Sequence, residues 1–109
     1  LVDVTEGTAG FLGQLGEWKT RDEVSAHNLM AFGTTVYAAY YQDGIRLIDI
    51  ADPANPRPAA WFNTWPGYDR GYGASFFEGA VGLDVDLARR RIYVADSHRD
   101  LLILADTRP

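Results

Sequence analysis

The sequence contains no cysteine. This absence excludes disulfide frameworks, zinc sites built from cysteine, and thiol chemistry. No apolar run reaches the roughly 18 residues that a transmembrane helix needs, so we predict no membrane-spanning segment. Positive charge is also scarce, because 10 Lys and Arg residues stand against 15 Asp and Glu residues and the net charge is −5. Nothing supplies a basic face for a phosphate backbone, so we predict no nucleic-acid partner.

The motifs that mark common catalytic and cofactor sites are missing as well. The sequence has no nucleophile elbow, no phosphate-cradling loop, no zinc motif and no dinucleotide fingerprint. No strand-to-helix transition follows Gly71-Tyr72-Gly73, and Ser25, Ser75 and Ser97 lack supporting context for nucleophilic catalysis. We therefore predict no cofactor and favour a non-catalytic role, although composition alone leaves enzymatic activity open.

The sequence does have enough apolar material for one domain. It has 109 residues, of which 47% are hydrophobic and 23% are charged, as is typical of a globular chain. No segment sustains a helical period, so an all-β fold is expected. The nearest helical candidate, Glu17–Met30, lacks an apolar stripe and predicts a loop with one helical turn at Arg21–Val24.

The clearest strand signals lie in the middle of the chain. Two runs rich in β-branched and aromatic residues, Val36–Tyr41 and Ile45–Ile50, flank Asp43-Gly44. An Asp-Gly pair between such runs predicts a hairpin, because both positions tolerate positive φ. Ala51–Pro58 holds three prolines, each without a backbone donor, so we expect this stretch to leave the sheet. The next strand is then expected at Ala59–Thr64.

The same order of segments recurs further along the chain. Residues 79–85, 91–96 and 101–104 resemble residues 25–31, 35–40 and 45–48, and Tyr37 and Tyr93 occupy equivalent positions 56 residues apart. Upstream, Leu1–Val4 resembles Leu47–Ile50, and Leu15–Trp18 takes the place of Ala59–Trp61. A repeat near 50 residues with about four strands is typical of a β-propeller blade.

The repeat divides the chain into four parts. Residues 1–24 are expected to hold the last two strands of a preceding blade and a loop, 25–64 a complete blade, 65–78 an aromatic and glycine-rich loop, and 79–109 three strands of a last blade. The strands of the complete blade are expected at Ala26–Phe32, Thr35–Gln42, Ile45–Ile50 and Ala59–Asn63. Such a partial ring would be completed by other chains or by further segments of a longer protein, and the start at Leu1 fits a processed chain. A self-contained β-sandwich or barrel is the alternative.

The residues of the complete blade resemble a known family. Ser25–Leu29, Val36–Tyr40 and above all Gly44–Pro56 are similar to the LVIVD-repeat β-propellers of bacterial secreted and cell-surface proteins. Gly44–Pro56 carries the pattern Gly-Leu-x-x-x-Asp-x-x-Asp-Pro-x-x-Pro, with Ile45 in place of leucine, whereas the last repeat has Asp100 at the glycine position and lacks the Asp-Pro exit. The resemblance implies an extracellular, cell-surface or periplasmic scaffold or protein-interaction module. Its partners would be the remaining blades or other protein chains, and it brings no enzymatic activity.

His27-Asn28 is the first candidate site. It opens the strand nearest the axis of a propeller, where ligands and metals are often bound, so His27 could bind a metal or a substrate. No second histidine lies at ligand spacing, because His98 falls on a loop. We favour a histidine that bonds the backbone of a neighbouring blade, and we predict no metal. Strand alternation would place His27 with Leu29, opposite Ala26 and Asn28.

The second candidate is the loop at 65–78. Aromatic residues between glycines suit a recognition surface for carbohydrate or protein, with Trp65, Tyr68, Tyr72 and Glu78 as the candidate ligand-binding residues. A loop that folds back over the channel is an equal alternative. No second carboxylate is assigned beside Glu78, so glycoside hydrolysis has little support.

The remaining polar candidates are assigned to turns. Asp43, Gly44, Asp49, Asp52, Pro53 and Pro56 are interpreted as turn-forming or capping residues. The alternative, a calcium site at Asp49, Asp52 and Asn55, lacks the oxygen count and spacing of a calcium loop. Asp86 is expected to open the turn into Arg89-Arg90-Arg91, which reads as a solvated hairpin tip rather than an anion site.

Overall fold

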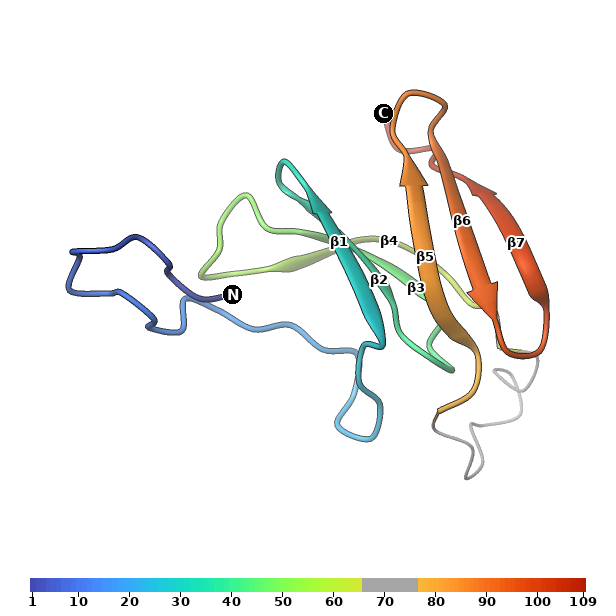
Figure 1. Ribbon diagram of the computed structural model, residues 1–109, viewed down its shortest axis with the longest axis horizontal. Helices are drawn as coiled ribbons and strands as arrows, with labels where there is room; N and C mark the ends of the chain where they lie inside the picture. Colours follow the sequence, from blue (N-terminus) through green and yellow to red (C-terminus); the bar gives the residue numbers. More distant parts are fainter. Residues whose placement is uncertain (66–76) are drawn as a thin grey trace.

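The computed structural model describes residues 1–65 and 77–109, which form two antiparallel β-sheets and no helix (Figure 1). The first sheet has the order β1-β2-β3-β4 and the second the order β5-β6-β7. The strands are β1 (Asn28–Phe32), β2 (Thr35–Ala39), β3 (Ile45–Asp49), β4 (Arg57–Phe62), β5 (Ala80–Asp86), β6 (Arg91–Asp96) and β7 (Asp100–Ala105). The all-β prediction is confirmed. No helix long and apolar enough to span a membrane is found in the described ranges.

The two sheets pair their strands in the same register. In the first sheet Tyr37 lies between Met30 and Leu47. In the second sheet Tyr93, its equivalent in the sequence repeat, lies between Asp84 and Ile103. Every other aligned position of the central strands follows this correspondence, so the sequence repeat is also a repeat of strand pairing.

The sheets stack with their first strands together. In Figure 1, β1 and β5 lie side by side, and β5 contacts both β1 and β2. Two backbone hydrogen bonds between Tyr41 and Ala80, of 2.9 and 3.0 Å, join the sheets just beyond these strands. The main core lies between the sheets and contains Tyr37, Ala39, Ile45, Leu47, Ala80, Ile92 and Val94.

A second, smaller core covers the opposite face of the first sheet. Ala38, Tyr40 and Ile48 are buried there with Val24, and Trp18 packs its ring edge-on against Tyr40 at 5.9 Å. The segment before β1 therefore shields part of a sheet face that would otherwise be open to solvent.

The proline-rich connection differs from the prediction at its end. β4 begins at Arg57 and includes Pro58, two residues earlier than expected, and the register shifts between Leu47 and Ile48. Proline is tolerated at an edge strand or a bulge, because there its missing N–H takes no bond from the ladder. Pro58 has both features.

Residues 1–24 also differ from the prediction. They contain no strand, and a single isolated bridge joins Val2 to Gln14. A turn at Asp22-Glu23 stands where one helical turn was expected at Arg21–Val24. Two short strands without a third strand beside them are only marginally stable, which explains why the expected pair at Leu1–Val4 and Leu15–Trp18 does not form here.

Candidate functional site

His27 lies immediately before β1, at the junction of the two sheets. Its backbone N–H donates to the Ala39 carbonyl at 2.8 Å, and its ring Nδ1 bonds the carbonyl of Val81 on β5. The ring also packs edge-on against Tyr41, with centroids 5.2 Å apart. His27 thus bonds the backbone of the neighbouring sheet. Asn28, exposed at the start of β1, pairs with Ala39.

The expected alternation does not extend back to His27. Ala26 and Leu29, assigned to opposite faces from the sequence, line the same cavity beside Ala38. β1 begins only at Asn28, so the two-residue alternation of a strand does not apply to the residues before it.

The candidate loop residues that the structure describes meet at His98. The Trp65 ring packs edge-on against the His98 ring at 4.6 Å, and Glu78 Oε1 lies 3.9 Å from His98 Nε2. Ser97 Oγ lies 3.0 Å from His98 Nδ1 and accepts the Gly79 N–H at 2.7 Å. The sequence placed His98 on a loop but gave no signal that it links Trp65 to Glu78. Tyr68 and Tyr72 lie outside the described residues.

The Asp43-Gly44 turn holds an ion pair between the buried Asp43 carboxylate and the half-buried Arg21 guanidinium. Asp43 is only 2% exposed, and its Oδ1 lies 3.1 Å from Nε of Arg21. The loop runs over residues 40–44, with positive φ at Tyr41 (46°) and Gly44 (71°), so it is longer than a two-residue hairpin. Asp43 therefore holds the segment before β1 through Arg21, and no local sequence pattern predicts this ion pair.

The carboxylates of the proline-rich turn are engaged with their own backbone. Asp49 Oδ1 accepts the Ala51 N–H at 2.9 Å, and Asp52 Oδ1 accepts the Ala54 N–H at 3.1 Å. The Asn55 side-chain amide donates to Asp52 Oδ2 at 2.8 Å, and these bonds lower the pKa of Asp52. Pro53 lies inside this turn and Pro56 at its end, directly before β4. The described residues hold no cluster of three or more potential metal ligands from His, Cys, Asp or Glu.

In the turn between β5 and β6, Asp86 bonds Arg89, the first residue of Arg89-Arg90-Arg91. Its Oδ1 accepts the Arg89 N–H at 2.9 Å, and its Oδ2 pairs with the Arg89 guanidinium at 2.8 Å. Both contacts lie within the hairpin, which fits the expected turn.

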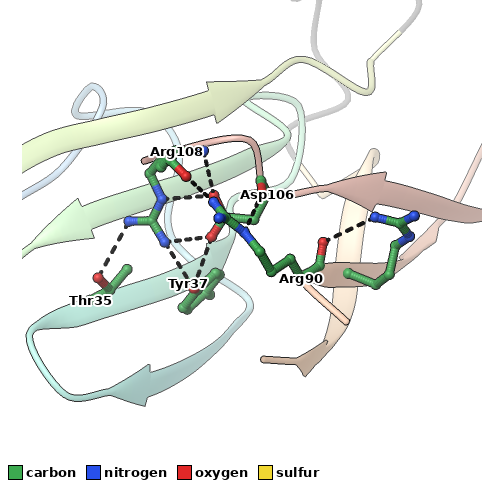
Figure 2. A network of polar contacts seen from close by, with 6 residues as sticks. Thr35, Tyr37, Arg90, Asp106 and Arg108 are labelled. Atoms are coloured by element: carbon green, nitrogen blue, oxygen red, sulfur yellow. Dashed lines mark hydrogen bonds and ion pairs between the residues drawn. The ribbon is translucent and has the colours of Figure 1, made fainter. Parts of the chain in front are cut away.

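A polar network that the sequence did not predict ties the segment after β7 to the first sheet (Figure 2). Arg108 pairs with Asp106 through Nη2–Oδ2 (2.6 Å) and Nε–Oδ1 (2.9 Å). The Tyr37 hydroxyl donates to Asp106 Oδ2 at 3.2 Å and accepts from Arg108 at 2.9 Å. Arg108 also reaches Thr35 Oγ1 at 3.4 Å, while Arg90 donates to the Asp106 carbonyl at 3.0 Å. The Arg108 side chain holds the pKa of Asp106 at about 2, and burial raises the pKa of Tyr37.

Beside this network the outer strands of the two sheets separate. A groove of about 370 Å³ opens between them. Its apolar lining includes Leu47 and Phe62 from the first sheet and Ile92 and Leu104 from the second, with Arg108 at its rim. The sheets therefore stack as a wedge, in contact at β1 and β5 and apart at β4 and β7.

Each sheet has two chemically distinct faces, which the shared register makes comparable. We call one the leading face; it carries Tyr37, Ala39, Ile45 and Leu47 in the first sheet and Tyr93, Ala95, Leu101 and Ile103 in the second. We call the other the trailing face; it carries Leu29, Val36, Ala38 and Ile48 in the first sheet and Leu83, Ile92, Val94 and Leu104 in the second. The leading face of the first sheet packs against the trailing face of the second.

The other two faces have no sheet against them in the part of the chain that the structure describes. On the leading face of the second sheet, Leu101 is 63% exposed and Ile103 is 59% exposed, whereas Ile45 and Leu47, their equivalents, are buried. On the trailing face of the first sheet, Leu29 is 58% exposed beside a cavity of about 300 Å³. Trp18 and Val24 cover Ala38 and Ile48 on this trailing face, so it is open only around Leu29 and the cavity. The open parts of the two faces and the free edge of β7 form the candidate interaction surface among the described residues. No protein-family model, curated protein or solved structure matches the chain.

Proposed function

We propose that this chain is a non-catalytic β-propeller module of the LVIVD type that acts as a scaffold or protein-interaction unit outside the cytoplasm. The observation that carries the proposal is the stacking of two sheets with identical register, leading face on trailing face, with their first strands together. Blades of a propeller stack in this way, each burying its faces only against its neighbours. The wedge between β4 and β7 supports the same interpretation.

The edge of the second sheet indicates how further strands would join. β3 is paired on both sides, by β2 and β4, whereas β7 is paired only by β6 among the described residues. A free edge that carries exposed apolar side chains promotes association with other chains. In a propeller module this edge takes a fourth strand, supplied by a partner or by another part of the same protein.

The engagement of the reactive side chains supports a structural role. His27 bonds a backbone carbonyl, Asp49 and Asp52 accept backbone N–H groups within a turn, and Asp106 pairs with Arg108 and Tyr37. Each of these side chains uses at least one polar atom to hold the fold, as a structural role requires.

The blade interpretation is tested by supplying the missing strand. Pro109 occupies the position of Pro53 in the repeat, so the sequence of residues 54–63, appended directly after Pro109, continues the repeat in phase. We expect the added segment to pair with β7 and raise Tm by about 5 °C, since one added strand contributes on the order of 1 kcal/mol. Amide exchange at Leu101 and Ile103 would slow at the same time.

The matched control carries the same segment with prolines at two alternate positions, which removes the backbone donors that would pair with β7. The control would leave Tm and exchange unchanged. If the unmodified segment also leaves Tm and the amide exchange of β7 unchanged, β7 is a natural outer edge and the blade interpretation is wrong.

A second candidate function is carbohydrate binding at the loop, because Trp65 and Glu78 meet at His98. Aromatic rings beside polar side chains suit the flat apolar faces and hydroxyls of sugars. Glycan-array binding that is lost in Trp65→Ala but kept in Trp61→Ala, a change at an exposed tryptophan of β4, would support this function over the scaffold role. If the wild-type chain and Trp61→Ala both fail to bind, carbohydrate binding is ruled out for the glycans tested.

A further inference from the structure

The leading face of the second sheet and the partly covered trailing face of the first sheet are of the two kinds that already meet once inside the molecule. We propose that a second copy of this chain docks head to tail, with the leading face of its second sheet on the trailing face of the first sheet. This inference rests on the proposed function and deepens it, because it names the partner as the chain itself. The argument comes from continuity with the observed stack between the two sheets.

The trailing side of this contact is a preformed apolar groove. The cavity of about 300 Å³ lies over β2 and β3 and is lined by Val36, Ala38 and Ile48 together with Trp18 and Leu29. No charged side chain is among the described residues that line the cavity, whereas Arg46, the equivalent of Leu102, lies on the same face of β3. In the observed stack the equivalent positions of the second sheet, Ile92, Val94 and Leu104, receive the leading face of the first sheet.

The leading side offers matching side chains. Leu101 and Ile103 stand where Ile45 and Leu47 stand in the first sheet, and Tyr93 stands where Tyr37 stands. The two faces differ at their ends: Asp84 and Asp86 on β5 replace Met30 and Phe32, and Arg91 at the start of β6 replaces Thr35. The apolar contact is therefore centred on β6 and β7, the strands that correspond to those beneath the groove.

The symmetry of the contact gives it a distinctive signature. The interface is heterologous, because a leading face meets a trailing face. An open assembly therefore always has one unpaired leading face at one end and one unpaired trailing face at the other. Closure into a ring of about four to eight sheets, the usual range for propellers, requires about two to four copies, since each copy contributes two sheets.

The test uses two exposed positions, one on each open face, so that the variants retain their fold. Leu29→Asp blocks the trailing face and Ile103→Asp blocks the leading face, and far-UV circular dichroism and Tm verify that each variant is folded. By light scattering after gel filtration we expect wild-type chain at about 100 μM to be oligomeric and each variant alone to be monomeric. Loss of one central apolar contact should weaken association at least about tenfold.

The decisive sample is a mixture of the two variants. One intact leading face and one intact trailing face remain in it, so a capped one-to-one dimer should form with about the affinity of wild type. The matched control Leu87→Asp, at an exposed apolar residue on neither face, should associate as wild type does.

Monomeric wild type, a mixture that stays monomeric, or a control that fails to associate would each overturn the proposal. If the copies stay monomeric while the added strand of the preceding test pairs with β7, the blade interpretation stands and only self-association is lost.

Discussion

At the scale of single residues, Gly44 has a strict geometric requirement. Its φ is 71°, and a Cβ added there would lie 2.3 Å from the Phe62 carbonyl oxygen and 2.7 Å from the Thr64 nitrogen. Gly44→Ala should therefore lower the free energy of unfolding by about 2 to 3 kcal/mol, through both left-handed strain and a clash with backbone. Urea titration measures the change.

Gly33 is the matched control, because its φ is 56° but nothing lies within 4 Å of an added Cβ. Gly33→Ala should cost only the strain, about 1 kcal/mol. Equal losses in the two variants would show that contact with β4 is not what requires glycine at position 44.

His27 carries a prediction that separates scaffold from ligand. Because its ring bonds the Val81 carbonyl and packs on Tyr41, His27→Asn should lower the free energy of unfolding by about 1 kcal/mol. Thermal unfolding measures the loss, and elemental analysis of both proteins should give the same metal content. A stoichiometric metal that disappears in the variant, with unchanged stability of the metal-free protein, would contradict the structural role.

The sequence predicted the residues that form turns, but it did not predict the residues that make long-range polar contacts. Asp-Gly and Asp-Pro pairs mark their turns locally, so Gly44, Asp49 and Asp52 could be assigned from sequence. The contact between Asp106 and Tyr37 could not be predicted, because the two residues lie 69 positions apart and only the stacking of the sheets brings them together. The roles of Arg21 and His98 were also missed, because their partners Asp43 and Trp65 lie far from them in the sequence.

At the scale of secondary-structure elements, strand pairing follows directly from the repeat. Alternating apolar residues and short turns predicted all seven strands of the two sheets, since each strand pairs with its neighbour in sequence. The pattern was misleading at Leu1–Val4 and Leu15–Trp18, where the residues resemble strands but have no sheet to join. Tertiary context decides whether such a segment pairs.

The elements should also differ in local stability. β2 and β3 are central and largely buried, whereas β7 has a free edge and exposed side chains. By hydrogen exchange we expect amides of β2 to exchange at least about tenfold more slowly than those of β7 that face the open edge. The Ile103→Asp variant serves for this measurement, because face-to-face association is blocked in it. Equal protection of both strands would show that β7 is covered.

At the scale of the whole molecule, the Asp106–Arg108–Tyr37 network clamps one sheet to the other. The pKa of Asp106 in the folded chain is about 2, below its usual value of 3.8, so the charged carboxylate stabilises the fold. This contribution is present above about pH 4 and is lost as the pH falls from about 4 to 2. Its size is about 2 kcal/mol.

Asp106→Asn removes the titrating group while keeping its shape. Between pH 5 and pH 2, wild type should lose about 2 kcal/mol more unfolding free energy than the variant does. Urea unfolding across this range measures both curves. Parallel curves would mean that the clamp does not depend on the charge of Asp106.

The shared register of the sheets has a consequence for how such a chain can change over generations. Equivalent positions of β2 and β6 lie 56 residues apart, and a slip of one residue within a strand would turn every side chain of that strand to the wrong face. Recombination between these segments would therefore insert or delete a whole repeat and leave every remaining strand pair intact. The number of sheets can thus vary among descendants while each sheet still meets the next through the same pair of faces.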